Sequence, residues 1–151
     1  MSNTPVVEGL KRVLADNYAL YLKTQNYHWN VEGAHFRELH LMFEEQYTDL
    51  ATAIDTAAEL IRGLGEKAPG SFAAYAGASI KAGNENASAE QMVKELAADQ
   101  RAISKTLQGA LEAAQKAGDE VVADYMIQRL TVHRKAAWML ESTLAGGGAN
   151  A

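Results

Sequence analysis

Apolar residues recur at the spacing of an α-helix in four long stretches of this chain. The clearest apolar stripe predicts a helix over residues 36–63. The last apolar residue of the stripe is followed by Gly63 and Gly65, which favour the end of a helix. Its members are Leu39, Phe43, Leu50, Ile54 and Ile61. The same periodicity predicts helices over residues 4–32, 88–117 and 119–144. Four amphipathic helices of this length indicate an all-α, four-helix bundle.

Capping residues indicate where two of these helices begin. Thr4 precedes Pro5, a pattern that favours Thr4 as the N-cap and Pro5 as the first helical residue. Ser88 and Gln91 resemble a capping box, which places the start of the third long helix at residue 88. The helix boundaries therefore follow from local signals.

The connection between the second and third long helices is itself long. Residues 66–85 contain Pro69 and Gly70, and we expect a short helix at 71–78 within them. A segment of this length can return the chain to the far end of the bundle. Residues 1–151 are therefore predicted to form one domain.

The fourth long helix has an apolar stripe, a short basic run and a glycine-rich end. The stripe comprises Val122, Tyr125, Met126, Leu130, Val132, Ala137 and Leu140. We interpret His133, Arg134 and Lys135 as a solvated face rather than a nucleic-acid contact. The tail GGGANA is expected to fray.

The composition of the chain limits its ligands and partners. Its 151 residues include no cysteine, so imidazole, carboxylate and water remain as metal ligands, a set that suits iron, manganese or zinc. No secretory leader is recognisable, and no apolar run reaches about 18 residues, so we expect a cytoplasmic protein with no membrane contact. The net charge is -5, and the first ten and last ten residues contain no Lys or Arg. These features predict weak or absent DNA binding.

Two pairs of candidate metal ligands lie on one face of the predicted helix 36–63. His40 and Glu44 are four residues apart, as are Asp55 and Glu59, so each pair projects from one side of the helix. His40 and Asp55 lie roughly 22 Å apart along a helix, which is too far to share one ion. A second copy of the helix, packed antiparallel about a two-fold axis, would place each His40 pair opposite the acids of its mate. We therefore predict two equivalent metal sites per dimer.

The proposed two-fold axis would pass near Asp49 and Leu50. The ligand-side positions around it are Thr48, Ala51 and Thr52, whose small side chains permit close approach of two helices.

A third candidate ligand lies on the preceding helix. His28 is six residues before Ala34 and His40 is six residues after it, so a helical hairpin that turns near Ala34 places the two imidazoles at the same height. Taken singly, His28 is more often a hydrogen-bonded core residue, and an acidic pair is more often a solvated face. Together they favour a metal site formed by His28, His40, Asp55 and Glu59, with Glu44 at its margin. Residues 32–35 fit a Glu-x-x-His spacing but are interpreted as a turn.

The same residues lie in motifs that resemble those of the Dps family of small ferritin-like proteins. The motifs are NYHWNVEGAHFRELHLMFEEQY at 26–47, DTAAELIRGLG at 55–65, GDEVVADYM at 118–126 and AAWMLESTL at 136–144. The resemblance implies a ferritin-like four-helix bundle with a short helix in its crossover. It also implies a hollow dodecamer with ferroxidase centres between two-fold-related subunits, where His28, His40, Asp55 and Glu59 are the ligands. Glu44 occupies a position that is often aspartate in the family.

The function implied by this resemblance is that of a mini-ferritin. We expect oxidation of Fe(II), with hydrogen peroxide preferred to dioxygen, and storage of ferric oxyhydroxide inside the shell, which protects the cell from oxidative damage. Two alternatives stay open. One is a nucleoid-compacting, DNA-binding shell in which iron chemistry is secondary. The other is a helical oligomer that holds zinc or another redox-silent divalent metal at the same ligands.

Two further features have more than one interpretation. Trp29 could relay a stray oxidising equivalent from the centre, or it could serve only in packing. In the family, the segment containing Asp119, Glu120 and Asp124 lines acidic channels at three-fold axes, so Asp119 and Asp124 are candidate cation guides. The alternative, held as equal, is that Asp119 is an ordinary helix N-cap.

Overall fold

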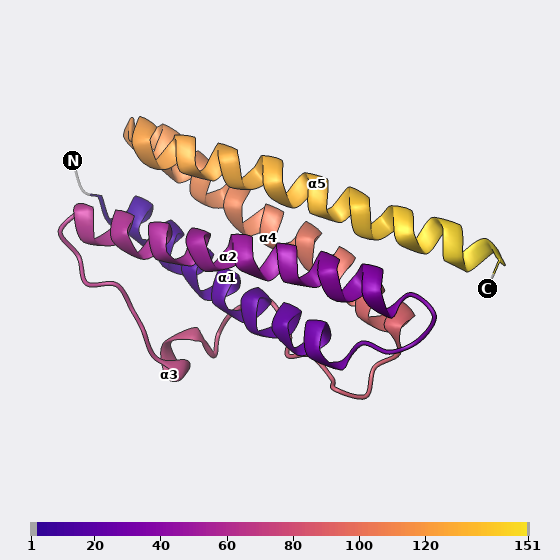
Figure 1. Cartoon of the computed structure of the whole chain (residues 1–151). Coiled ribbons are helices and arrows are strands. Elements are labelled where there is room, and N and C mark those ends of the chain that lie inside the picture. Colours follow the sequence, from indigo (N-terminus) through magenta and orange to yellow (C-terminus); the bar gives the residue numbers. More distant parts are fainter. Residues whose placement is uncertain (1–2, 151) are drawn as a thin grey trace.

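The fold is a bundle of four long helices with one short helix in a crossover. The computed structural model describes the backbone of residues 3–150 and the side chains of residues 3–144, and within these it has five helices and no strand. The helices are α1 (Thr4–Asn30), α2 (Phe36–Gly63), α3 (Phe72–Tyr75), α4 (Ala89–Ala117) and α5 (Glu120–Asn150). In Figure 1, α2 and α4 run in the same direction, so the crossover that contains α3 travels the length of the bundle. The predicted all-α bundle with a crossover is confirmed.

The core forms where the apolar stripes of the long helices meet. Helix α1 packs on α2, α4 packs on α5, and the contact between α1 and α4 joins the two pairs. The largest fully buried apolar side chains include Leu10, Leu14, Phe43, Leu50, Met92, Leu96, Ile103 and Met126. Each contributes roughly 1.5–3 kcal/mol relative to an exposed position. No helix described in residues 3–150 combines the length and the apolarity needed to cross a bilayer.

The α1 boundaries differ slightly from the predicted ones, whereas α2 begins and ends as expected. Asn3, not Thr4, is the N-cap of α1, and its carbonyl accepts a hydrogen bond from the Val7 amide at 3.0 Å. Proline is tolerated one position further in because the first helical amides need no intrahelical acceptor. The helix ends at Asn30 rather than 32, since Val31 adopts extended backbone and buries its side chain.

Helices α4 and α5 are joined by a single tight turn. At the opposite end of α4, where the helix begins, the Gln91 amide donates to Ser88 Oγ at 3.1 Å, as the capping-box pattern predicted. In the turn between α4 and α5, Gly118 adopts a left-handed conformation with φ of 75°, which glycine accommodates without strain.

The predicted end of the last helix was wrong, because the α5 backbone continues to Asn150. Glycine weakens a helix without terminating it as proline does.

The crossover is held against the bundle by a buried carboxylate. Asp16 of α1 accepts hydrogen bonds from the Ser79 amide at 2.8 Å, from Ser79 Oγ at 2.5 Å and from Thr106 Oγ1 at 2.6 Å. The short helix spans Phe72–Tyr75 instead of the predicted 71–78. After Tyr75 the Ala78 amide closes a turn on the Tyr75 carbonyl, and the Ser79 amide donates to Asp16 and not to a helix carbonyl.

Candidate metal centre

The turn between α1 and α2 places two histidines face to face. Gly33 in this turn has φ of 115°, a conformation that side chains other than glycine rarely adopt. Beyond it, the rings of His28 and His40 stack with centroids 3.8 Å apart and planes 12° apart. The prediction that the two imidazoles lie at the same height is confirmed. His28 is 7% exposed, so its ring sits inside the hairpin.

Each histidine is oriented by the backbone of the other. His28 Nδ1 lies 2.7 Å from the carbonyl oxygen of His40, and His40 Nδ1 lies 2.6 Å from the carbonyl oxygen of His28. A carbonyl can only accept, so both Nδ1 atoms act as donors, and in the neutral imidazole this leaves the Nε2 lone pair for a metal. This hydrogen-bonding arrangement is the one that holds metal-binding imidazoles in place.

Glu44 completes a group of three donors within one chain. One ligand atom from each of His28, His40 and Glu44 lies within 4.8 Å of the other two. No other group of three such donors occurs among the described residues. Glu44 sits one helical turn after His40 and is exposed, so its carboxylate is free to turn toward the imidazoles. Glu44, expected at the margin, thus joins both histidines.

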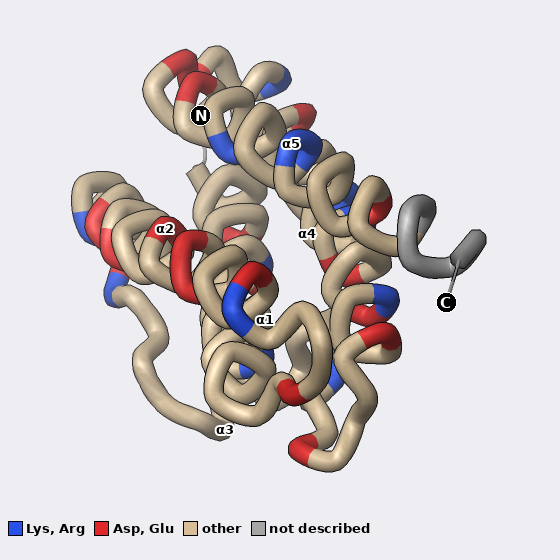
Figure 2. The backbone as a smooth tube through the Cα atoms, turned by 45° about the vertical axis from the view of Figure 1, so that its right-hand side comes forward, with Lys and Arg blue, Asp and Glu red and all other residues tan. Residues whose placement is uncertain are grey.

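Asp55 and Glu59 do not reach this group within the chain. Both lie further along α2 and are exposed to solvent. Figure 2 shows acidic residues recurring along α2 on the outside of the bundle. Thr48, Ala51 and Thr52, which lie between the two ligand pairs, are also exposed. The face of α2 that carries the candidate ligands is therefore uncovered in the single chain.

Aromatic rings border the histidine pair on two sides. Phe36 stacks on His40 with centroids 4.9 Å apart, and Tyr47 meets the edge of His28 at 5.2 Å. Sequence analysis missed both, although Phe36 and Tyr47 lie four residues before and seven after His40, on the same side of α2. Trp29 is 61% exposed, so within the described chain it does not pack in the core.

The geometry of this centre is accompanied by extensive similarity to known proteins. Residues 7–147 match the family model of the ferritin-like domain. The DNA protection during starvation protein 2 of Bacillus anthracis is 36% identical over 143 residues, which cover 94% of this chain and 98% of that protein. A Dps protein from Bacillus brevis has a crystal structure similar to this one, with a TM-score of 0.91 at 36% identity, covering 95% of this chain and 99% of that one. The chain belongs to the Dps family.

A second similar Dps structure belongs to a protein described by its diiron-carboxylate chemistry. The Dps protein of Vibrio cholerae O1, described as a member of a broad superfamily of ferritin-like diiron-carboxylate proteins, has a TM-score of 0.90 at 32% identity. The alignment covers 94% of this chain and 90% of that one. The ferritin-like fold is thereby confirmed. Membership of the Dps family supports iron storage or DNA protection in general.

In this Dps-family chain, the acidic residues at the start of α5 have different surroundings. Asp119 is the N-cap, and its Oδ1 accepts a hydrogen bond from the Val122 amide at 3.0 Å. Asp124 is exposed and accepts a hydrogen bond from Gln128 at 2.8 Å. The capping interpretation of Asp119 is confirmed. The channel role of Asp119 and Asp124 stays a prediction.

The interpretation of His133 as part of a solvated face was wrong. His133 is 2% exposed, and its Nδ1 donates to Gln100 Oε1 at 2.6 Å while its Nε2 faces Arg129 at 3.1 Å. Burial, together with the adjacent Arg129 guanidinium, lowers the pKa of His133 from 6.5 to about 3. Arg134 and Lys135 are exposed as expected, whereas Val132, assigned to the apolar stripe, is 37% exposed. The basic run therefore straddles the edge of the core.

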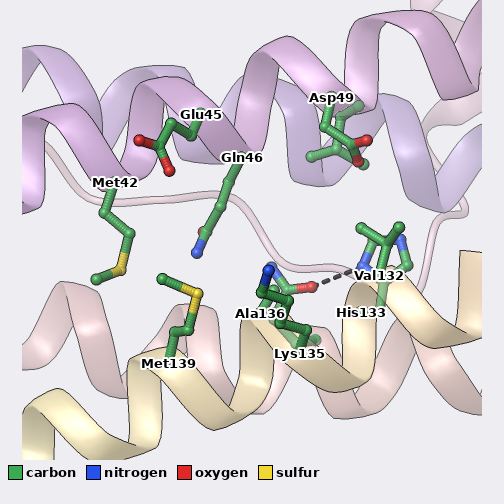
Figure 3. A pocket seen from close by; sticks show the side chains of 11 residues that line it. Met42, Glu45, Gln46, Asp49, Val132, His133, Lys135, Ala136 and Met139 are labelled. Carbon is green, nitrogen blue, oxygen red and sulfur yellow. Dashed lines mark hydrogen bonds between the residues drawn. The ribbon is translucent and has the colours of Figure 1, made fainter.

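His133 lines a pocket of about 320 Å³ between α2 and α5. Figure 3 shows Met42 and Met139 at one end of this pocket and His133 at the other, with Glu45 and Gln46 above. Arg129 reaches across to Asp49 of α2, with 2.8 Å between Nη2 and Oδ2. Because both ring nitrogens of His133 already have partners, this pocket lacks a free imidazole for a metal.

Proposed function

We propose that this protein is a ferroxidase and iron-storing mini-ferritin. It oxidises Fe(II), preferentially with hydrogen peroxide, at sites shared between two subunits, and stores ferric oxyhydroxide inside a hollow dodecamer. By consuming both iron and peroxide it protects the cell from oxidative damage. The observation that carries the proposal is that His28 and His40 orient each other by reciprocal hydrogen bonds and form, with Glu44, a group whose donor atoms lie within 4.8 Å of one another.

The donor set fits ferrous iron as a substrate. Imidazole and carboxylate bind Fe(II), and the carboxylate stabilises the more highly charged ferric product by a larger amount. Zinc or another divalent ion can occupy the same donors. The three donors of one chain do not fill the coordination sphere of iron, which leaves positions for carboxylates of a second subunit and for oxidant or water.

A second subunit supplies the missing acids in this proposal. Asp55 and Glu59 are exposed on the same helix as His40 but stand outside the one-chain donor group. Antiparallel packing of two α2 helices about an axis near Asp49 and Leu50 brings each acid pair to the histidines of the mate. The exposed Thr48, Ala51 and Thr52 allow the two helices to approach closely. The description of the Vibrio cholerae relative as a diiron-carboxylate protein supports the same chemistry.

Subunit complementation tests the shared site directly. One variant carries His28→Ala and His40→Ala, and a second carries Asp55→Asn and Glu59→Gln. We expect each alone to lose peroxide-driven formation of the ferric absorbance band. When the two are co-expressed, each mixed dimer contains one intact centre, so about a quarter of all centres should regain activity.

The outcome separates the shared site from the alternatives. Activity in either parent variant, or no recovery in the mixed shells, would contradict the proposal. Binding of Fe(II) without any ferric band in the wild-type protein would instead identify a redox-silent metal store. Size-exclusion chromatography of every sample controls for assembly and tests the dodecamer.

We also propose that DNA is at most a weak partner of this protein. The net charge of -5 opposes the approach of a phosphate backbone. A gel-shift assay at physiological salt and neutral pH should show no stable complex. A salt-resistant complex would favour the nucleoid-compacting alternative.

A further inference from the structure

A continuous series of four tyrosine rings begins at the metal centre. The ring of His28 contacts Tyr47 at a centroid distance of 5.2 Å, and Tyr47 contacts Tyr21 at 5.9 Å. Tyr21 contacts Tyr18 at 5.9 Å, and Tyr18 stacks on Tyr75 at 4.9 Å with an angle of 24° between the planes. Every step is a direct ring contact.

The series joins three separate elements of the fold. Tyr47 lies on α2, Tyr18 and Tyr21 lie on α1, and Tyr75 ends the short helix α3 in the crossover. The hydroxyl of Tyr75 donates to the carbonyl oxygen of Pro69 at 2.5 Å, which fixes the ring that ends the series. The fold therefore connects the histidine pair to the crossover through phenol rings.

We propose that Tyr47, Tyr21, Tyr18 and Tyr75 form a one-electron relay that supplies the centre with an electron when only one iron is bound. The inference rests on the proposed ferroxidase function and adds a redox role for this chain's own side chains. Phenol is the most readily oxidised group in the series, and close ring contacts allow an electron vacancy to pass from one phenol to the next.

Reduction of hydrogen peroxide to water needs two electrons, and one bound Fe(II) supplies only one. The relay supplies the second electron. One Fe(II) gives one electron to hydrogen peroxide, which breaks the O–O bond and yields Fe(III), hydroxide and a hydroxyl radical. Tyr47 gives the second electron and its phenolic proton, so the radical becomes water and a tyrosyl radical remains. A later Fe(II) returns one electron, and a proton from water restores the phenol. In sum, two Fe(II), one peroxide and two protons give two Fe(III) and two waters.

The surroundings indicate where the radical comes to rest. Tyr18 is 37% exposed, so water can take up the proton that its phenol loses on oxidation, while the Tyr47 phenoxyl takes back one proton from water as it is reduced. The phenol of Tyr75 is less favourable, because burial raises its pKa and its proton is held by the Pro69 carbonyl. Tyr21 accepts a hydrogen bond from Gln25 Nε2 at 3.2 Å. We assign the resting radical to Tyr18.

The remaining oxidisable rings provide controls. The chain has six tyrosines, and Tyr27 and Tyr125 stand outside the series. The phenols of these two donate instead to Glu95 at 2.6 Å and to the Ala53 carbonyl at 2.7 Å. Trp29 is next to His28 in sequence and is 61% exposed, so it is the natural competitor as a radical site.

The experiment uses the assembled protein with one Fe(II) per centre, mixed anaerobically with hydrogen peroxide and frozen within the first turnover. Electron paramagnetic resonance of protein grown with ring-deuterated tyrosine identifies a tyrosyl radical by the narrowing of its signal. We expect a tyrosyl signal in the wild type, and its loss when two irons per centre supply both electrons. A spin trap for hydroxyl radical gives a second readout.

Three substitutions locate the radical. Tyr47→Phe should abolish the signal and raise the trapped hydroxyl radical at one iron per centre, whereas Tyr18→Phe should leave a tyrosyl signal with a different hyperfine pattern, because the vacancy then stays on Tyr47 or Tyr21. The matched control Tyr125→Phe should keep it. Circular dichroism and shell size confirm that each variant is folded and assembled.

Each result supports or contradicts the relay. A signal that survives Tyr47→Phe but disappears in Trp29→Phe would overturn it, as would the absence of any tyrosyl signal while Fe(III) forms normally. Those outcomes leave the ferroxidase function intact. If the wild type formed no Fe(III) with peroxide, the proposed function itself would fail, and the relay with it.

Discussion

His28 and His40 hold each other through their backbones: each Nδ1 faces the carbonyl oxygen of the other residue, at 2.7 and 2.6 Å. A shift of α1 relative to α2 would break both hydrogen bonds together. The two imidazole ligands are therefore positioned by the helical hairpin itself. Their orientation does not depend on bound metal, so the chain presents a preorganised pair of Nε2 donors.

Replacement of either histidine should weaken metal binding by a similar factor. We expect His28→Ala or His40→Ala to lower the affinity for Co(II) by at least about tenfold, since each change removes one imidazole ligand while the backbone carbonyl that orients the other imidazole remains. Calorimetric titration of the assembled protein measures the affinity. His35→Ala is the control, because this exposed histidine lies outside the donor group and its ring bonds to Glu38 at 3.1 Å. Equal losses in all three variants would contradict the assignment.

Neutralising the acidic residues at the start of α5 should slow iron uptake without unfolding the helix. In the double variant Asp119→Asn and Asp124→Asn, the asparagine at 119 keeps the N-cap because its side-chain oxygen accepts the Val122 amide equally well. Loss of the negative field should reduce the initial rate of mineral formation. Binding of Co(II) at the histidine centre should be unchanged. An unaltered uptake rate would remove the channel role.

Burial of His133 should make the protein less stable in acid. Its pKa is about 3 in the folded chain and near 6.5 when unfolded, so the unfolded state binds more protons between these values. The contribution of His133 is complete above pH 6.5 and is lost as the pH falls toward 3, by about 1.4 kcal/mol per pH unit at most. Urea unfolding at pH 7, 6 and 5 measures this slope.

A matched variant isolates the His133 contribution to that slope. His133→Asn retains a donor for Gln100 Oε1 but does not titrate in this range. We expect a shallower pH dependence of the unfolding free energy than in the wild type. Identical slopes would show that groups other than His133 dominate the pH dependence.

A methyl group at Gly83 should loosen the crossover. A Cβ there would lie 3.0 Å from Tyr27 Cε1 and 3.2 Å from both Asn26 Nδ2 and Lys23 Cγ, all on α1. We expect Gly83→Ala to destabilise the protein by about 1–3 kcal/mol, as overpacking commonly does. Gly77→Ala lies in the same crossover with nothing within 4 Å, so it serves as the control in thermal unfolding. A midpoint for Gly83→Ala equal to that of the control would refute the close packing.

Several features of the fold could be predicted because their causes are local. The bounds of α2 follow from its apolar stripe and its glycines, and the start of α4 follows from Ser88 and Gln91. The two histidine rings lie at the same height because His28 and His40 are each six residues from the turn at Ala34. Such signals act over one or two turns of helix, and a single sequence contains them completely.

Other features could not be predicted because they join distant parts of the chain. The residues next to His133 in sequence do not reveal that Gln100, on another helix, accepts a hydrogen bond from its ring. This hydrogen bond lowers the free-energy cost of burying the imidazole. Nor does the spacing of Tyr18 and Tyr75 disclose that their rings stack at 4.9 Å. The sequence near Ser79 likewise does not disclose that its amide donates to Asp16, which is 63 residues away.

The sequence by itself determined the helices, the turn at Gly33 and the choice of imidazole and carboxylate as candidate ligands, since backbone propensity and side-chain chemistry are properties of neighbouring residues. Only the tertiary structure decided which atoms of those ligands are free, because a carbonyl on the opposite helix selects the protonated nitrogen of each histidine. It also decided which polar groups are buried and which rings touch. Those relationships depend on how the helices pack, and packing is a property of the whole chain.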